Sequence, residues 1–279
     1  MIIPNPRRGE EIDGFGTRSP ELLIKLGQMH VRQDDYPEAR NYFTEALDIY
    51  IDIADRKGEA NALFQLARVH RFEDEHNQAI PLYTKALEIY TDIGDRGWRA
   101  LILWNLAEMH RRRDEYDDAI MLYTEALQIW TDIGNRGGRA DALGGLAEVH
   151  RLQNEYSEAI TLYSEELQIR TEIGDSQGRA ESLWGLAEMY RLRKEYSQAI
   201  TFFSEALEIS TGIGTIYRKA WVLEGLADVH RDQDHHSDAI RHYEQAAETF
   251  KQIGRTKDAA RASKEAARVR RLLKEKEAA

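Results

Sequence analysis

A histidine, several acids and a run of arginines lie within one short stretch, Leu106–Tyr116, which reads LAEMHRRRDEY. These residue types could belong to an active site related to the zinc motif H-E-x-x-H, in which histidines bind the metal and a glutamate acts as the base. Closely related stretches, whose starts are spaced 40 residues apart, begin at Leu26, Leu66, Leu146, Leu186 and Leu226. Because an active site is seldom needed six times, the repetition predicts a structural unit.

The unit at residues 97–136 shows which elements carry these side chains. Apolar residues recur every three or four positions in two runs, separated by the charged break Arg113–Glu115, and this spacing predicts two helices. The first run is Leu103, Leu106, Ala107 and His110, and the second is Tyr116, Ala119, Ile120, Tyr123, Leu127, Trp130 and Ile133. Gly134 can adopt the left-handed conformation that ends the second helix, and Asn135 can cap the next helix. Neither helix hides its apolar stripe alone, so the hairpins must stack on their neighbours.

Composition narrows the function classes. The chain has 279 residues, a formal net charge of −11 and no cysteine. The acidic balance disfavours nucleic acid as a partner, because phosphate binding needs a basic surface. Without cysteine, disulfides, thiolate nucleophiles and cysteine-based zinc sites are excluded. No window reaches 18 uninterrupted apolar residues and the N-terminus has no apolar leader, so we expect a cytoplasmic protein without a membrane partner.

The repeated residues resemble the tetratricopeptide repeat family. That family places a large residue, Leu, a small residue and an aromatic in its first helix, then Tyr, Ala, an aromatic and Ala-Leu in its second. The third unit offers Leu103, Leu106, Ala107 and His110, then Tyr116, Ala119, Tyr123, Ala126 and Leu127. The period of 40 exceeds the family's 34. It is similar to the longer repeats of G-protein-signalling modulators, rapsyn and kinesin light chains, and of fungal and bacterial signalling proteins.

The resemblance covers Ser19 to Ile253 and implies an all-α, right-handed superhelical solenoid of six helix–turn–helix repeats. We expect residues 1–18, rich in glycine and charge, to form a flexible extension, and residues 19–256 to form the repeats. Ser19 and Pro20 suit the N-cap and the first position of the opening helix. Residues 257–279, rich in Ala, Arg and Lys, are expected to form a solvating helix that caps the last hairpin.

The recurrent histidines are better explained by packing than by metal binding. His30, His70, His110, His150 and His230 occupy the first-helix position where the family has an aromatic residue. Equivalent positions lie at least one helix-packing distance apart, roughly 8–10 Å, whereas zinc ligands lie about 2.0–2.1 Å from a single ion. We therefore expect half-buried histidines with local hydrogen bonds.

A separate histidine cluster in the sixth unit leaves two interpretations open. Its members are His230, His235, His236 and His242, with Asp232 and Asp234 nearby. Either the turn gathers two or three of them into an adventitious transition-metal site, or they form a solvated polar turn. His242 is the member least expected to join such a site, because it lies about 10 Å along the second helix from His235.

The resemblance also assigns a partner-binding surface. In the family, the first-helix face beside the core stripe lines the concave groove. The candidate partner-binding residues are Phe64, Arg68, Arg71, Trp104, Asn105, Glu108, Arg111, Gly144, Gly145, Glu148, Arg151, Trp184, Gly185, Glu188, Arg191, Trp221 and Arg231.

Two features of this set each have two interpretations. In four units an acid precedes the arginine by three residues, which predicts either intrahelical ion pairs, worth about 0.2–0.5 kcal/mol each, or an arginine ladder that binds partner carboxylates. Glycine interrupts the first helices at Gly144, Gly145, Gly185 and Gly225, at a cost of up to about 1 kcal/mol relative to alanine. These glycines either open a hollow flanked by Trp104, Trp184 and Trp221 that acts as a binding hot spot, or they permit tight helix packing.

No catalytic or cofactor motif is present: there is no G-x-S-x-G, no G-x-x-x-x-G-K-[ST], and no G-x-G-x-x-G after a predicted strand. We therefore expect a non-enzymatic scaffold without a cofactor or metal that binds a peptide or helical segment of a protein partner in its groove. One alternative is a sensor or regulatory array of a larger, nucleotide-binding receptor-like signalling protein. Another is a self-assembling array, a homo-oligomer formed by end stacking.

Overall fold

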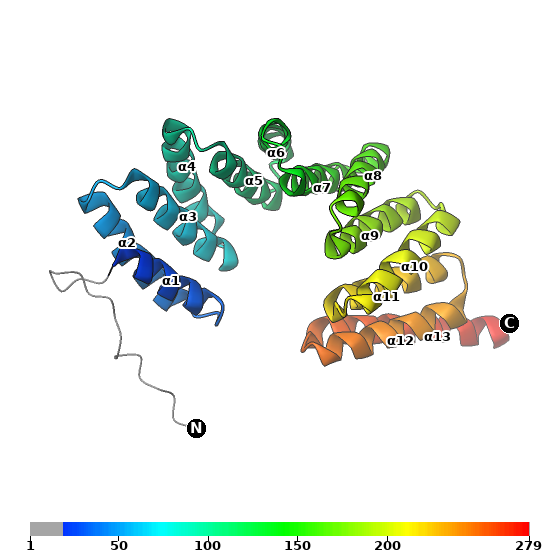
Figure 1. Cartoon of the computed structure of the whole chain (residues 1–279). Coiled ribbons are helices and arrows are strands. Elements are labelled where there is room, and N and C mark those ends of the chain that lie inside the picture. Colours follow the sequence, from blue (N-terminus) through cyan, green and yellow to red (C-terminus); the bar gives the residue numbers. More distant parts are fainter. Residues whose placement is uncertain (1–18, 279) are drawn as a thin grey trace, which may run out of the picture. The chain divides into compact units, whose positions relative to one another are not determined.

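The computed structural model describes residues 19–278, so the extension predicted at residues 1–18 lies outside the described residues. Within residues 19–278 the chain forms thirteen α-helices and no strand (Figure 1). The helices are α1 Pro20–Val31, α2 Tyr36–Asp52, α3 Arg56–Phe72, α4 His76–Ile93, α5 Arg96–Arg112, α6 Tyr116–Asp132, α7 Arg136–Leu152, α8 Tyr156–Glu172, α9 Ser176–Leu192, α10 Tyr196–Gly212, α11 Ile216–Asp232, α12 His236–Gln252 and α13 Thr256–Ala278.

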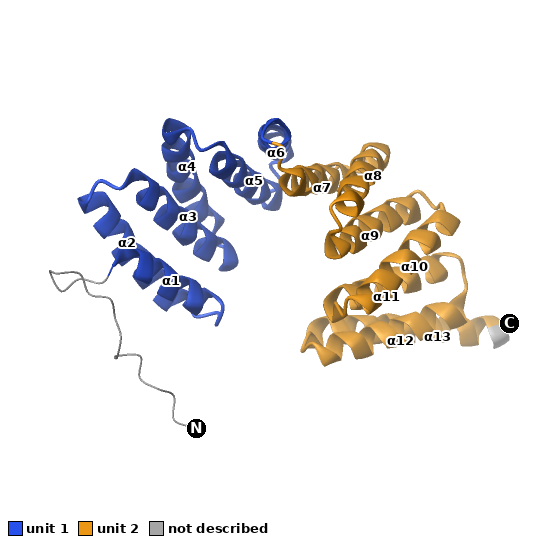
Figure 2. Cartoon of the chain, in the orientation of Figure 1, with its two compact units in different colours: residues 1–133 blue, residues 134–279 orange. Residues whose placement is uncertain are grey.

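The chain divides into two compact units, residues 1–133 and 134–279 (Figure 2). Unit 1 holds the first three hairpins, α1–α2, α3–α4 and α5–α6. Unit 2 holds the fourth to sixth hairpins, α7–α8, α9–α10 and α11–α12, followed by α13. Within each unit every helix packs against the next one in sequence, which is the arrangement of a helical-hairpin solenoid. The predicted all-α fold is confirmed.

The connectors between hairpins follow the predicted glycine and cap pattern. Gly134 has a φ of 70°, and the side chain of Asn135 accepts a hydrogen bond of 3.0 Å from the backbone N–H of Gly138. Asp95 caps α5 in the same way. Thr215 makes no such bond to α11. The turn inside the third hairpin instead places a non-glycine residue, Asp114, in the left-handed region, with a φ of 60°.

Each hairpin is closed by an aromatic ring of its second helix. These rings are almost completely buried: Phe43, Tyr83, Tyr123, Tyr163, Phe203 and Tyr243. A small residue of the first helix faces the ring in the same hairpin. A Cβ added to Gly27 would lie 2.5 Å from Phe43, so this helix pair needs glycine there.

The C-terminal helix α13 covers the last hairpin with small residues. Ala259 and Ala262 pack in one cluster with Phe250, and Ala266 and Val269 pack with Tyr243. None of the helices in residues 19–278 is long and apolar enough to cross a membrane.

Candidate functional site

Four of the five recurrent histidines are bonded within their own hairpin turn. In each, Nδ1 lies within hydrogen-bond distance of a carboxylate five residues on: His30 and Asp35 at 2.9 Å, His70 and Glu75 at 2.7 Å, His110 and Glu115 at 2.7 Å, and His150 and Glu155 at 2.6 Å. The rings are half-buried. The expectation of half-buried, locally bonded histidines is confirmed for these four.

The fifth histidine, His230, is bonded differently. Its ring stacks on that of His242 with centroids 5.2 Å apart, closer than the 6.0 Å to His235. His242, the member least expected to join a site in this turn, thus lies beside His230, because the antiparallel return of α12 brings it back beside α11. The same offset joins His30 to Tyr42 and Tyr190 to Phe202. Burial lowers the pKa of both His230 and His242, the latter to about 4, so both rings are neutral at pH 7.

Two groups in the described part of the chain bring histidine and acids close enough to hold a metal ion, and neither includes a histidine of the sixth hairpin. They are His70 with Glu73 and Glu75, and His110 with Glu115 and Asp118. An arginine already binds a carboxylate in each group: Arg40 contacts Glu73, and Arg113 lies 2.9 Å from Glu115. A cation would have to compete with these arginines.

Four of the six candidate groove arginines are bonded to the acid three residues earlier in their own helix. The pairs are Arg111 and Glu108 at 2.9 Å, Arg151 and Glu148 at 2.5 Å, Arg191 and Glu188 at 2.9 Å, and Arg231 and Asp228 at 2.6 Å. The geometry favours the intrahelical ion-pair interpretation for these four.

Where the buried aromatic residue of these four hairpins is tyrosine, its hydroxyl also donates a hydrogen bond to the same acid. The Tyr163 hydroxyl donates to Glu148 at 3.1 Å, and Tyr123 and Tyr243 donate to Glu108 and Asp228. The fifth hairpin has Phe203 instead, so this hydroxyl donor is missing beside Glu188. Burial raises the pKa of Glu188, and Arg191 offsets this only in part.

The second hairpin breaks this pattern. Arg68 stands where the four later hairpins carry the acid, so Arg71 has no acid three residues before it. Arg68 donates to Gln65 at 3.0 Å, and its guanidinium lies 5.8 Å from the ring centre of Phe64. Both arginines also lie over Phe72, at 5.7 and 4.8 Å from the ring centre.

Three arginines of unit 1 thus lack a carboxylate partner among residues 19–278: Arg32, Arg68 and Arg71, here called the arginine patch. Arg32 and Arg68 line a pocket of about 260 Å³ with Gln28, Val31 and Gln65. Burial lowers the pKa of Arg68, and Tyr83 counteracts this only in part. The Nε of Arg71 is buried without a hydrogen-bond partner. A carboxylate from another molecule would satisfy these groups with charge-assisted hydrogen bonds.

Two predicted groove residues of unit 1 lie in the core instead. Phe64 is 5% exposed and packs edge-on against Tyr83 and Trp98. Asn105 is 4% exposed, accepts a hydrogen bond of 3.3 Å from the Tyr83 hydroxyl and donates to the Leu101 carbonyl at 2.7 Å. Phe64 contacts its own and the following hairpin, and Asn105 contacts the preceding one, so neither side chain is free to contact a partner.

The glycine of the fifth hairpin, Gly185, lies at the position equivalent to Asn105 and also packs against the aromatic ring of the preceding hairpin. A Cβ on Gly185 would lie 2.7 Å from the ring of Tyr163 in the preceding hairpin, and one on Gly225 would clash with Phe203 in the same way. The tight-packing interpretation therefore holds for Gly185 and Gly225, and the hollow expected there is filled by the aromatic ring. Gly145 is half-buried in α7.

Gly144 makes room for an acid. A Cβ there would lie 3.0 Å from the Glu166 carboxylate, which is 6% exposed and occupies a position held by alanine in the other five hairpins. Arg170 lies 3.4 Å from Glu166 and 3.0 Å from Asp175. In the fourth hairpin, glycine therefore replaces the large residue of the first helix and glutamate replaces the alanine of the second helix.

The predicted tryptophans are covered by neighbouring side chains. Trp104 is half-buried and lies edge-on to Tyr123, with ring centres 6.5 Å apart. Arg218 covers Trp184 at 5.7 Å, and Arg261 of α13 covers Trp221 at 4.9 Å. Within unit 2, Trp184 and Trp221 therefore pack against different helices and do not flank one hollow.

Sequence reasoning missed Arg32 and Phe72 as members of the candidate site. A signal for the patch was present, because Arg68 replaces an acid found at the equivalent position of four other units. Arg32 and Phe72 end their helices beside the charged turns, where the repeat pattern gives no reason to single them out.

These observations define the class of protein as an all-α array of stacked helical hairpins. Residues 18–92, 98–172, 156–212 and 178–252 match the tetratricopeptide repeat family, and the chain belongs to that family. No curated protein matches the chain significantly.

Several solved structures share the fold. Aspartyl phosphate phosphatase F from Bacillus subtilis has a TM-score of 0.68 at 14% identity, covering 90% of this chain and 70% of its own. A Rap protein complexed with competence and sporulation factor has a TM-score of 0.64 at 16% identity, with coverage of 92% and 76%. A signal-transduction ATPase with a tetratricopeptide repeat sensor from Pyrococcus horikoshii has a TM-score of 0.67 at 18% identity, with coverage of 88% and 37%. At these identities the likeness shows the fold alone.

Proposed function

We propose that this chain is a non-enzymatic protein-interaction scaffold whose arginine patch binds a carboxylate-bearing peptide or helical segment of a partner. Family membership supports the scaffold, because tetratricopeptide repeats are interaction modules. The patch supports the chemistry of the partner. It is the place on the predicted groove face where arginines are partly desolvated, lie over an aromatic ring and have no acid of their own.

The remaining groove arginines contribute less in this proposal. Arg111, Arg151, Arg191 and Arg231 are already bonded to acids of their own helices, so a partner carboxylate would have to displace those acids. A hydrogen bond to a charged group contributes about 1.5–3 kcal/mol when its partner is otherwise missing. We therefore assign the main affinity to Arg68 and Arg71. The similarity to a Rap protein that binds competence and sporulation factor is compatible with a small protein or peptide ligand.

A second candidate has equal support. The chain spans 37% of the signal-transduction ATPase that it resembles, whose repeats are named as a sensor. In this alternative the array is the sensor or regulatory part of a larger signalling protein, and the patch binds either a ligand or another domain of that protein. One similar fold belongs to a named phosphatase, but at its low identity this does not carry over to a catalytic role here. A cytoplasmic location and end-stacked oligomers stay predictions of the sequence.

The test compares the intact chain with an Arg68→Gln/Arg71→Gln variant in a proteome-scale pull-down. The control is Arg56→Gln/Lys57→Gln, which removes two exposed positive charges from the same helix, α3. The proposal expects partners that the patch variant loses and the control retains, with at least tenfold weaker binding of the purified partner. Equal loss with both variants would indicate a nonspecific charge effect and overturn it, as would partners retained by both.

A further inference from the structure

The last hairpin departs from the other five along one face of its second helix. His242, Gln245 and Thr249 are spaced i, i+3 and i+7, so they share a face of α12. The other five hairpins all have isoleucine at the position equivalent to Thr249 and a charged residue at the position equivalent to Gln245. At the position equivalent to His242 they have a large aromatic residue or leucine. Those equivalents are Ile49, Ile89, Ile129, Ile169 and Ile209; Glu45, Lys85, Glu125, Glu165 and Glu205; Tyr42, Leu82, Leu122, Leu162 and Phe202.

The loss of charge at Gln245 removes an ion pair that recurs in four hairpins. In those hairpins the first helix and the second helix are joined at these positions by Glu59 and Lys85, Arg99 and Glu125, Arg139 and Glu165, and Arg179 and Glu205. In the sixth hairpin the basic residue is kept as Lys219, but Gln245 cannot neutralise it. Lys219 is half-buried and forms no ion pair within residues 19–278.

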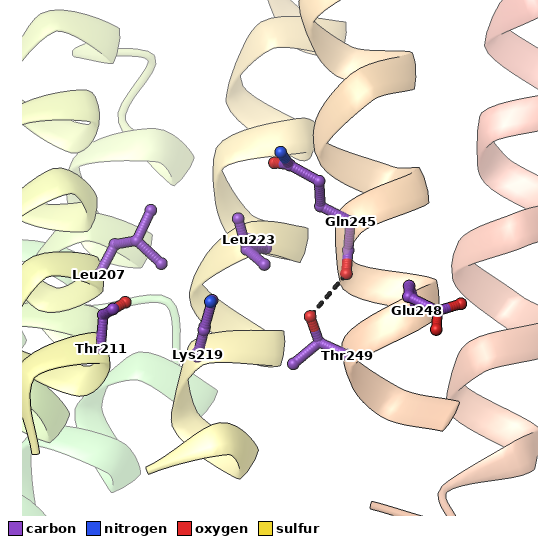
Figure 3. A pocket seen from close by; sticks show the side chains of 7 residues that line it. All are labelled: Leu207, Thr211, Lys219, Leu223, Gln245, Glu248 and Thr249. Atoms are coloured by element: carbon purple, nitrogen blue, oxygen red, sulfur yellow. Dashed lines mark hydrogen bonds between the residues drawn. The ribbon is translucent and has the colours of Figure 1, made fainter. Parts of the chain in front are cut away.

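Lys219 lies in a hollow between α10 and α12. Figure 3 shows Lys219 and Leu223 on α11 between Leu207 of α10 and Thr249 of α12. This hollow has a volume of about 410 Å³. A second one, of about 580 Å³, shares Leu207 and Thr211 with it and extends along α11 over Leu226 to His230 and His242. We call the two together the α10–α12 trough.

The floor of the trough has the spacing of a helix-binding groove. Lys219, Leu223, Leu226 and His230 follow one another at i, i+4, i+7 and i+11 along α11, a stripe about 16 Å long. An amphipathic helix presents its anchoring side chains at the same intervals. The stripe runs from Lys219, which forms no ion pair among the described residues, through Leu223 and Leu226, which are each 4% exposed and form the bottom of the hollows, to two stacked neutral imidazoles. Glu248 and Glu208 also line the trough. The stripe therefore calls for an acid beside Lys219 at one end of the ligand and apolar side chains along the rest.

We propose that the α10–α12 trough is a second interaction surface, which binds an amphipathic helical segment of a partner with one carboxylate on Lys219 and leucine-like side chains over Leu223 and Leu226. The ligand carboxylate takes the place of the acid that four other hairpins supply themselves. Charge complementarity at Lys219 selects the acidic segment, and the two leucines select its apolar face. The surface is formed by the end of unit 2 and does not depend on the arginine patch of unit 1.

The probe is a synthetic alanine–glutamine helical peptide in which one glutamate and two leucines follow the i, i+4, i+7 spacing, made in both chain directions and labelled for fluorescence anisotropy. Lys219→Gln is expected to weaken its binding about tenfold, which corresponds to about 1.4 kcal/mol. Gln245→Glu is expected to do the same without disturbing the fold, because it restores the ion pair of the other hairpins. The control, Lys251→Gln, removes an exposed lysine from α12 and should leave binding unchanged.

A charge exchange makes the test specific. Lys219→Glu should lose the acidic peptide and gain a peptide that carries lysine in place of glutamate. Binding that is indifferent to the charge at residue 219, or no binding of the peptide in either direction, overturns the proposal. Binding of dodecanoate that depends on Lys219, without peptide binding, would assign the trough to a fatty-acid-like ligand and also overturn it. So would self-association in sedimentation experiments that Lys219→Glu abolishes. None of these outcomes bears on the pull-down with the arginine-patch variant, so the two proposals can fail separately.

Discussion

Glu59 and Lys85 form an ion pair of 3.2 Å between α3 and α4, with the signs reversed from those of the next three hairpins. There the first helix supplies arginine and the second helix glutamate, as in Arg99 and Glu125. Since either orientation is found, the position requires opposite charges and no particular residue type. This rule makes the combination of Lys219 and Gln245 an exception.

Reversing one charge of this pair should cost stability, and reversing both should restore it. We expect Lys85→Glu to lower the free energy of unfolding by about 0.5–1 kcal/mol, because it places two carboxylates together. The double variant Glu59→Arg/Lys85→Glu should return to within about 0.5 kcal/mol of the original, since it reproduces the orientation of the third hairpin. Urea unfolding at low and high salt measures this. If the double variant is no more stable than Lys85→Glu, the pair does not act through charge.

Adding one methyl group to Gly185 should destabilise the fold. The new Cβ would lie 2.7 Å from the buried ring of Tyr163, so we expect Gly185→Ala to lower the free energy of unfolding by about 1–3 kcal/mol. The gain in helix propensity, about 1 kcal/mol, offsets only part of this. The matched control is Gly212→Ala at the end of α10, where the new Cβ would have no neighbour within 4 Å apart from the adjacent residues and the backbone of its own helix. Thermal unfolding should show the control equal to or more stable than the original chain, and the opposite order would refute the packing role.

Glu166 should make the chain less stable as the pH rises from acid towards neutrality. Burial raises its pKa to about 7 from the ordinary 4.5, and Arg170 offsets only part of this. The folded state therefore holds the proton more tightly than the unfolded chain does. The free energy of unfolding should fall between pH 4.5 and 7, by up to about 3 kcal/mol. Glu166→Gln should remove this dependence, as judged from urea unfolding on the two sides of the window. Parallel pH profiles for the two proteins would contradict the prediction.

His242 should have the opposite effect, on the acid side. Burial lowers its pKa to about 4 from 6.5, so the unfolded chain takes up the proton first as the pH falls. This group therefore contributes stability above pH 6.5 that is lost as the pH falls towards 4. Replacing it with the leucine of three other hairpins, His242→Leu, should narrow the difference in melting temperature between neutral and acidic solution. An unchanged difference would show that His242 is not responsible for it.

The local features of the fold could be predicted from the sequence because each rests on residues a few positions apart. Helix spacing, the Gly134–Asn135 connector and the bond from His110 to Glu115 all belong to this kind. The ion pair of Arg151 with Glu148 was also visible as an interval of three.

The features that could not be predicted depend on contacts between elements. Gly185 and Asn105 sit on a stripe that meets the aromatic ring of the preceding hairpin, and nothing in the intervals within one helix reveals that ring. The contact between His230 and His242 depends on how far α12 returns along α11. That Lys219 lacks an ion-pair partner becomes apparent only by comparison with the other hairpins, where the structure shows the equivalent residue paired, as Arg179 is with Glu205.

The bond from the Tyr83 hydroxyl to Asn105 has a consequence for how such an array can grow by duplication. Gly225 occupies the equivalent position in the first helix of the sixth hairpin, and it packs against a phenylalanine, Phe203, of the preceding hairpin. The third hairpin requires a predecessor with a tyrosine hydroxyl. After a phenylalanine it would leave the buried amide oxygen of Asn105 without a donor, at a cost of about 1–3 kcal/mol. Gene duplication can therefore insert hairpins next to the glycine-bearing first helices more readily than between the second and third hairpins. Homologues of different length should accordingly differ in the number of hairpins beside those glycines.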